Sequence, residues 1–120
     1  MCIRDRYATV HTAGGADMLR AAVAGMAQGA ASAGMTEPCV LGVTVLTSDA
    51  TAPPEVLRER AALAAATGCG GLVCAAADLP VTRDAAPGLV TVVPGIRPSG
   101  VPSHDQARAA GCLLYTSRCV

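Results

Sequence analysis

Runs of apolar residues without polar alternation limit the possible folds of this chain more than any other feature. They cover residues 39–46 (CVLGVTVL), 71–77 (GLVCAAA) and 89–93 (LVTVV), and a shorter β-branched run at residues 8–11 (ATVH) precedes them. A strand with one solvated face alternates apolar and polar residues, whereas a strand covered on both faces reads as a continuous apolar run. The sequence therefore predicts a buried parallel sheet.

Segments with helical spacing separate these runs. Residues 16–34 are rich in alanine and space larger apolar side chains at helical intervals, and residues 53–67 begin with two prolines and carry early glutamates, as helices often do. The connection at residues 78–88 has room for about one helical turn, and a further helix is expected to begin at Ser103 or Asp105.

The alternation of strand and helix is typical of parallel βα units, which makes the fold class α/β. Four such strands fit a small doubly wound sheet, and they equally fit half of an eight-stranded βα barrel, which typically needs about 250 residues. Residues 8–110 form the expected core. Residues 1–7 and 111–120 resemble foreign linker sequence and are not expected to carry function.

Composition excludes several classes of function. The formal net charge is zero, and all nine basic residues are arginine, which argues against nucleic-acid or polybasic membrane binding. Only two residues are aromatic, so a base-stacking platform is not expected. No apolar run is long enough to cross a membrane, and the first residues are too charged for a signal peptide, so we expect a cytoplasmic protein.

Six cysteines suggest a disulfide framework or a metal site only at first sight. Cys69 and Cys74 do not form a CxxC pair, and the two histidines lie far from them in sequence. We therefore expect no metal, and free thiols in a reducing compartment.

Both candidate folds place functional residues at the carboxyl ends of strands. The ends hold polar side chains at His11, at Thr47 to Asp49, at Asp78 and at Arg97. Arg97 is the most unusual, because VVPGIRPSG holds one guanidinium between prolines after a buried strand, and a planar fork of donors suits a phosphate.

Structural roles compete with binding roles at several of these positions. Thr47 is favoured as a ligand residue, whereas Ser48 or Asp49 is expected to bond local backbone. His11 is expected to be structural rather than a base, and Asp78 and His104 to be structural or to face solvent. Glycines 14 and 15 fit an ordinary βα turn better than a phosphate site.

At this point the strand ends resemble the orotidine 5′-phosphate decarboxylase family, in its bacterial form. The resemblance rests on VHTAGG, GVTVLTS, GLVCAA and VPGIRPSG followed by DQ, in this order and spacing. It implies part of a TIM barrel, about strands four to seven. It also implies decarboxylation of orotidine 5′-monophosphate to UMP without a cofactor, usually in a homodimer.

The resemblance assigns roles to four residues. Thr47 resembles the hydroxyl residue that hydrogen-bonds the pyrimidine, and Pro94 the apolar contact beside the base. Arg97 falls at the arginine of the substrate-binding GIR, and Gln106 at the amide that reaches toward phosphate and base.

The chain departs from the family in its catalytic centre. The family's Asp-x-Lys-x-x-Asp motif, whose lysine protonates the carbanion left by CO₂, has no counterpart here, and the sequence has no lysine at all. We therefore expect an internal fragment without catalytic residues of its own, inactive and prone to self-association. Alternatives are a fragment of another phosphate-binding decarboxylase barrel of the same superfamily, or an inert truncated chain.

Overall fold

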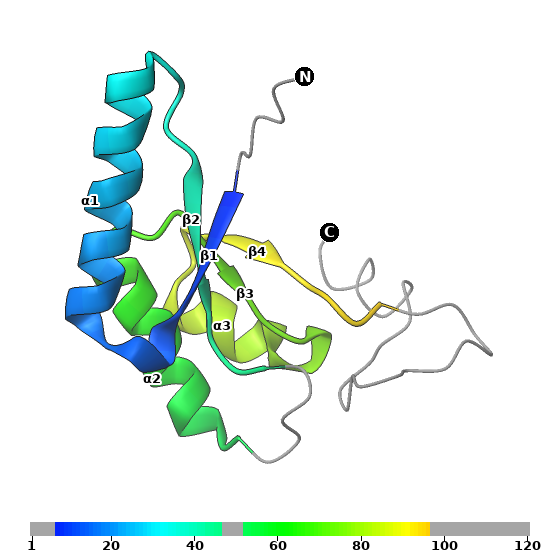
Figure 1. Cartoon of the computed structure of the whole chain (residues 1–120). Helices are drawn as coiled ribbons and strands as arrows, with labels where there is room; N and C mark the ends of the chain where they lie inside the picture. The colour runs from blue at the N-terminus through cyan, green and yellow to red at the C-terminus, as the bar shows by residue number, and fades with distance from the viewer. Residues whose placement is uncertain (1–6, 47–51, 97–120) are drawn as a thin grey trace.

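A computed structural model describes residues 7–46 and 52–96. It contains one sheet of four strands, and Figure 1 shows them side by side: β1 (Tyr7–His11), β2 (Cys39–Val43), β3 (Gly71–Val73) and β4 (Val90–Val92). The order in the sheet is β1-β2-β3-β4, and every neighbouring pair is parallel. The parallel sheet predicted from the apolar runs is confirmed.

Three α-helices and two short 3₁₀ segments connect the strands. They are η1 (Thr12–Gly14), α1 (Ala16–Ala33), α2 (Pro54–Ala66), η2 (Ala76–Asp78) and α3 (Leu79–Ala85). The two long helices are confirmed to within a residue at each end. The helix expected from Ser103 or Asp105 lies outside the described residues.

Two expectations were wrong in detail. The run at residues 71–77 forms a strand only as far as Val73. Cys74, Ala75 and Ala76 are also apolar, but they are buried in the turn that leads to α3 and do not belong to the strand. The connection expected to hold one helical turn instead carries the seven residues of α3. Burial alone does not distinguish a strand from a tight buried turn.

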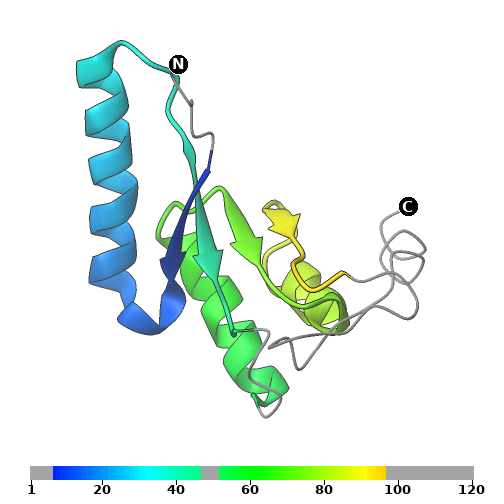
Figure 2. The same ribbon diagram turned by 45° about the vertical axis from the view of Figure 1, so that its right-hand side comes forward.

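The strand order distinguishes the two candidate folds. Right-handed crossovers between strands that advance in one direction across a sheet place every helix on the same face, whereas a doubly wound sheet reverses direction and has helices on both faces. The order β1-β2-β3-β4 contains no reversal, and the helices group on one side of the sheet in Figure 2. The described chain therefore has the winding of a barrel.

The hydrophobic core lies between the sheet and these helices. Val40 and Leu72 point from neighbouring strands toward the helices and are almost fully buried. They meet Leu19 of α1 and two alanines of α2, Ala61 and Ala64. Since alanine keeps α2 close to the sheet, the few large side chains carry most of the apolar burial.

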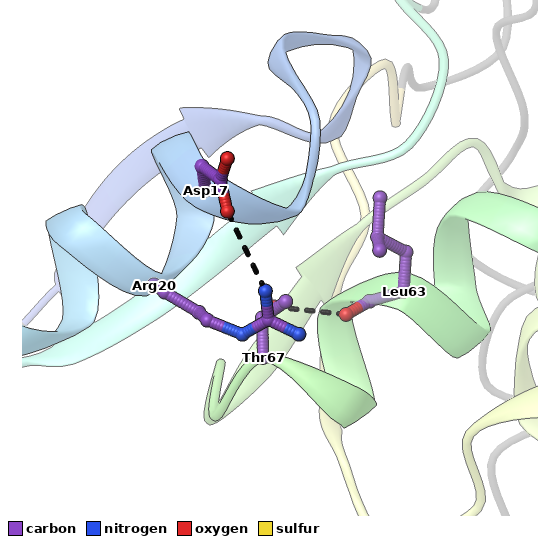
Figure 3. Close-up of polar contacts among 4 residues, drawn as sticks. All are labelled: Asp17, Arg20, Leu63 and Thr67. Atoms are coloured by element: carbon purple, nitrogen blue, oxygen red, sulfur yellow. Dashed lines mark hydrogen bonds and ion pairs between the residues drawn. The ribbon is translucent and has the colours of Figure 1, made fainter.

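The ends of the helices are fixed by local polar contacts, two of which appear in Figure 3. Arg20 lies 3.6 Å from Asp17 in the first turns of α1, an exposed pair of small energetic weight. At the end of α2, the hydroxyl of Thr67 donates to the carbonyl of Leu63 at 2.8 Å, and the same carbonyl accepts the backbone N–H of Thr67 at 3.0 Å. Gly34 ends α1 with φ of 64°, a conformation that favours glycine.

Three cysteines of the described residues carry free thiols, Cys39, Cys69 and Cys74. Cys69 packs in the core beside Thr67, and burial raises the pKa of its thiol, an effect that the hydrogen bond to the Thr67 side chain partly offsets. The thiol therefore stays protonated and unreactive near neutral pH. This is the behaviour expected of a structural cysteine.

We expect Gly71→Ala and Gly29→Ala to change stability in opposite directions. A Cβ on Gly71 would lie 2.5 Å from a methyl of Leu41 and 2.7 Å from the carbonyl oxygen of Val90, so the substitution should cost about 1–3 kcal/mol. A Cβ on Gly29 meets nothing within 4 Å, so alanine there should stabilise α1 by up to about 1 kcal/mol. The urea midpoints of unfolding measure both changes in stability. If the two substitutions shift the midpoint in the same direction, the packing of β3 against β4 is contradicted.

Candidate functional site

The carboxyl ends of all four strands lie along one edge of the sheet. The register aligns His11, Val43, Val73 and Val92 in a single row across β1 to β4. Parallel βα folds collect their functional groups at this edge. Thr47 and Arg97 follow β2 and β4 in sequence, but both lie outside the described residues.

Two buried threonines fix the backbone at this edge. The hydroxyl of Thr12 donates to the carbonyl of Val43 at 2.9 Å, and the hydroxyl of Thr44 donates to the carbonyl of Val73 at 3.0 Å. Each threonine follows one strand and donates to the last carbonyl of the next strand, so that neighbouring strand ends are tied together. Both threonines are at most 2% exposed, and their bonds to Val43 and Val73 are therefore partly shielded from water.

Arg60 brings a positive charge to the same edge. Its guanidinium reaches from α2 and donates to the carbonyl of Thr44 at 2.7 Å. A charged donor makes a stronger hydrogen bond than a neutral one. Arg60 therefore holds the backbone of β2 at the point where the chain leaves the strand toward Thr47.

Pro94 is the one predicted binding residue that lies within the described part of the chain. It follows β4 by two residues, is half-buried and precedes Gly95, whose φ of 76° turns the chain at the edge. Thr47, Arg97 and Gln106 lie outside the described residues. The structure therefore does not test whether the four residues lie close together, and their common site stays a prediction.

Other strand-end residues divide between surface and core. His11 ends β1 on the exposed surface, whereas Asp78 is only 6% exposed at the start of α3, so of the two roles expected for Asp78 the structural one applies. The Asp78 backbone accepts a hydrogen bond from the hydroxyl of Thr82, which also lies 3.6 Å from the thiol of Cys74. Asp78 thus belongs to a packed turn.

Sequence reasoning did not single out Thr44 or Arg60. The only signal for Thr44 is a hydroxyl that interrupts an apolar run just before the strand end. For Arg60 there is no signal, because an arginine at the margin of the exposed face of a helix looks the same in sequence whether it contacts the sheet or not. Within residues 7–46 and 52–96, no group of three or more His, Cys, Asp or Glu side chains could hold a metal ion.

Consecutive parallel strands with helices on one face and a fixed polar edge define the class of this protein: part of a TIM barrel. The chain belongs to the orotidine 5′-phosphate decarboxylase / HUMPS family, whose family model matches residues 6–112. The resemblance drawn from the strand-end motifs is thereby confirmed. In the described part of the chain, no helix is long and apolar enough to cross a membrane.

Curated relatives carry the same family name. Orotidine 5′-phosphate decarboxylase of Anaeromyxobacter dehalogenans is 47% identical over 113 residues, and that of Lactiplantibacillus plantarum is 37% identical over 115 residues. Each alignment covers 85% of this chain, but only 46% and 48% of the respective relatives. The chain thus spans about half the length of the curated relatives it matches.

Solved structures agree in fold. The crystal structure of orotidine 5′-phosphate decarboxylase from Lactobacillus acidophilus matches with a TM-score of 0.66 and 30% identity, over 78% of this chain and 46% of that one. An uncharacterized conserved protein from Geobacillus kaustophilus matches with a TM-score of 0.66 and 25% identity, over 94% of this chain and 61% of that one. The partial barrel expected from the sequence is confirmed.

Proposed function

We propose that this chain is the substrate-binding part of an orotidine 5′-phosphate decarboxylase, which converts orotidine 5′-monophosphate to UMP and CO₂ in pyrimidine synthesis. The observation that carries the proposal is the family match together with the order of the motifs, whose described parts lie in or directly after successive parallel strands of one sheet. The names of the curated relatives support the same activity.

The four predicted residues would contact different parts of the nucleotide. Thr47 would hydrogen-bond the pyrimidine and Pro94 would contact it through apolar surface, which suits a half-buried proline at the edge of the sheet. Arg97 would bind the phosphate, and Gln106 would reach between phosphate and base. Thr12, Thr44 and Arg60 contact no substrate in this proposal, but they fix the end of β2, from which the chain continues to Thr47.

The chain by itself is proposed to bind without catalysing. Decarboxylation in this family needs a lysine that protonates the carbanion, and none of the nine basic residues is a lysine. Arginine cannot replace it, since a guanidinium does not release a proton at neutral pH. We also propose the properties that the family implies: no metal or organic cofactor, a cytoplasmic location, no nucleic-acid or membrane partner, and a homodimer of complete barrels.

A chimera tests the activity directly. Residues 8–110 would replace the aligned segment of the Anaeromyxobacter dehalogenans relative, which keeps its own remaining segments. We expect this chimera to form UMP from orotidine 5′-monophosphate, measured by product chromatography, and the 120-residue chain alone to form none. The intact relative is the positive control.

A chimera that folds, as judged by circular dichroism, but leaves orotidine 5′-monophosphate unchanged would overturn the assignment. UMP formation by the 120-residue chain alone would overturn the claim that the lysine must come from elsewhere. Neither result depends on how the chain assembles.

A further inference from the structure

The end of β2 carries a backbone carbonyl that the sheet does not pair. Thr44 directly follows the strand, and its N–H donates to the carbonyl of Val73 at 3.1 Å. One residue further along β3, the N–H of Cys74 donates instead to the carbonyl of Val92, at 3.1 Å. Within residues 7–46 and 52–96, no backbone N–H donates to the Thr44 carbonyl. A buried carbonyl without a donor destabilises the fold, so this one needs a side-chain partner.

Arg60 is the main donor to the Thr44 carbonyl. Its Nη1 atom lies 2.7 Å from the carbonyl oxygen. The hydroxyl of Thr12 lies 3.5 Å from the same oxygen, but it has one proton to donate and makes its shorter bond, of 2.9 Å, to the carbonyl of Val43. Thr44 is 1% exposed, so its carbonyl depends on the guanidinium rather than on bulk water.

The two arginines of α2 have different partners. Arg58 forms an ion pair with Asp84 of α3, and both of these side chains are largely exposed. In the described part of the chain, no carboxylate forms an ion pair with Arg60. The half-buried Arg60 guanidinium therefore directs its charge at the end of β2, as a charge-assisted hydrogen bond to backbone.

This bond joins the two ends of the connection that contains Thr47. The connection leaves β2 after Val43 and enters α2 at Pro54, and the bond from Arg60 to Thr44 ties the helix to the strand across 16 positions. Only two residues separate Thr44 from Thr47 in the sequence. Because each residue extends a chain by at most about 3.6 Å, little chain is available to absorb a shift of the strand end.

We propose that Arg60 is a positioning residue for nucleotide binding. It touches no substrate, and it acts by fixing the backbone from which Thr47 reaches the pyrimidine. This inference rests on the proposed function, in which Thr47 hydrogen-bonds the base. Since the contact lies between the end of β2 and α2, both within the transplanted segment, we expect the same contact in the chimera.

The test begins with kcat/KM of the chimera for orotidine 5′-monophosphate. Arg60→Met keeps the aliphatic stem and removes the donors, and it should lower kcat/KM roughly tenfold, as small displacements of a binding group do. Arg60→Lys keeps a charged donor and should lose less than about threefold. The control, Arg58→Met, removes the same charge from the same helix and should leave kcat/KM unchanged.

A double-mutant cycle distinguishes positioning from a purely structural role. In a Thr47→Val chimera, the hydroxyl through which Arg60 acts is absent, so Arg60→Met should cost less than about twofold more. An equal tenfold loss in both backgrounds would mean that Arg60 acts elsewhere, and would overturn the proposal. No loss in the Thr47 background would overturn it as well.

Failure of the inference differs from failure of the proposed function. An inactive parent chimera that folds overturns the proposed function, and this inference falls with it. An active parent chimera that is insensitive to Arg60→Met overturns this inference alone. Circular dichroism melting shows which variants fold. If Arg60→Met does not, Arg60→Gln keeps a polar side chain at the half-buried position and is measured in both backgrounds against the same criterion.

Discussion

In the chimera, Arg97→Ala is expected to lower kcat/KM for orotidine 5′-monophosphate by roughly 100-fold. A hydrogen bond to a charged group contributes about 1.5–3 kcal/mol, and a bidentate guanidinium offers two of them to a phosphate. Since the phosphate lies away from the bond that breaks, the contact should stabilise ground state and transition state alike. The loss should therefore appear mostly in KM and little in kcat.

Steady-state kinetics of UMP formation measures this effect. Arg97→Lys keeps the charge but loses the planar fork, so we expect an intermediate loss of about tenfold. Arg20→Ala removes an exposed arginine of α1 and should leave both constants unchanged. A loss confined to kcat would place Arg97 at the reacting group instead of the phosphate, and no loss would remove it from the site.

Much of the fold could be predicted because its periodicities are local. The run CVLGVTVL is apolar on both faces, since Val40 meets the helices and Leu41 lies on the opposite face of the sheet. The helix at Pro54–Ala66 begins with proline and glutamate, whose preference for the first turn does not depend on the rest of the fold. Elements of this kind are visible in sequence.

The choice between barrel and doubly wound sheet could not be made from periodicity. Both folds use identical βα units, and they differ only in whether the strand order reverses. That order is a property of how β2 and β3 pair in space, and no spacing along the chain encodes it. The family motifs pointed to the barrel because they carry information beyond the local pattern.

The candidate site, like the fold, has features that are visible in the sequence and others that depend on tertiary structure. The polar residues at strand ends were visible because apolar runs stop at them, and Pro94 does lie at the predicted edge. The contacts that stiffen this edge were not visible, since Arg60 and Thr44 are 16 positions apart and meet only after α2 packs. Long-range side-chain to backbone bonds depend on tertiary structure, so a sequence suggests candidate binding groups more readily than the groups that support them.

Leu72→Ala is expected to lower the free energy of unfolding by about 2–5 kcal/mol, toward the upper end of that range. Leu72 is 1% exposed and packs from β3 into the core cluster that holds Val40, Ala61 and Ala64. The cost of such a truncation grows with the cavity that remains. The alanines of α2 have no side-chain freedom with which to fill it, and backbone movement of α2 would disturb its contact with the other strands.

Urea unfolding of the 120-residue chain, followed by circular dichroism at constant protein concentration, measures the loss through the midpoint at unchanged slope. Leu46→Ala is the matched control, because the same atoms are removed from a side chain that is 53% exposed, and its cost should stay below about 1 kcal/mol. If Leu72→Ala is already unfolded in water, Leu72→Val removes less volume and should give a measurable, smaller loss. Equal effects at Leu72 and Leu46 would contradict a core centred between β3 and α2, because only a buried leucine leaves a cavity.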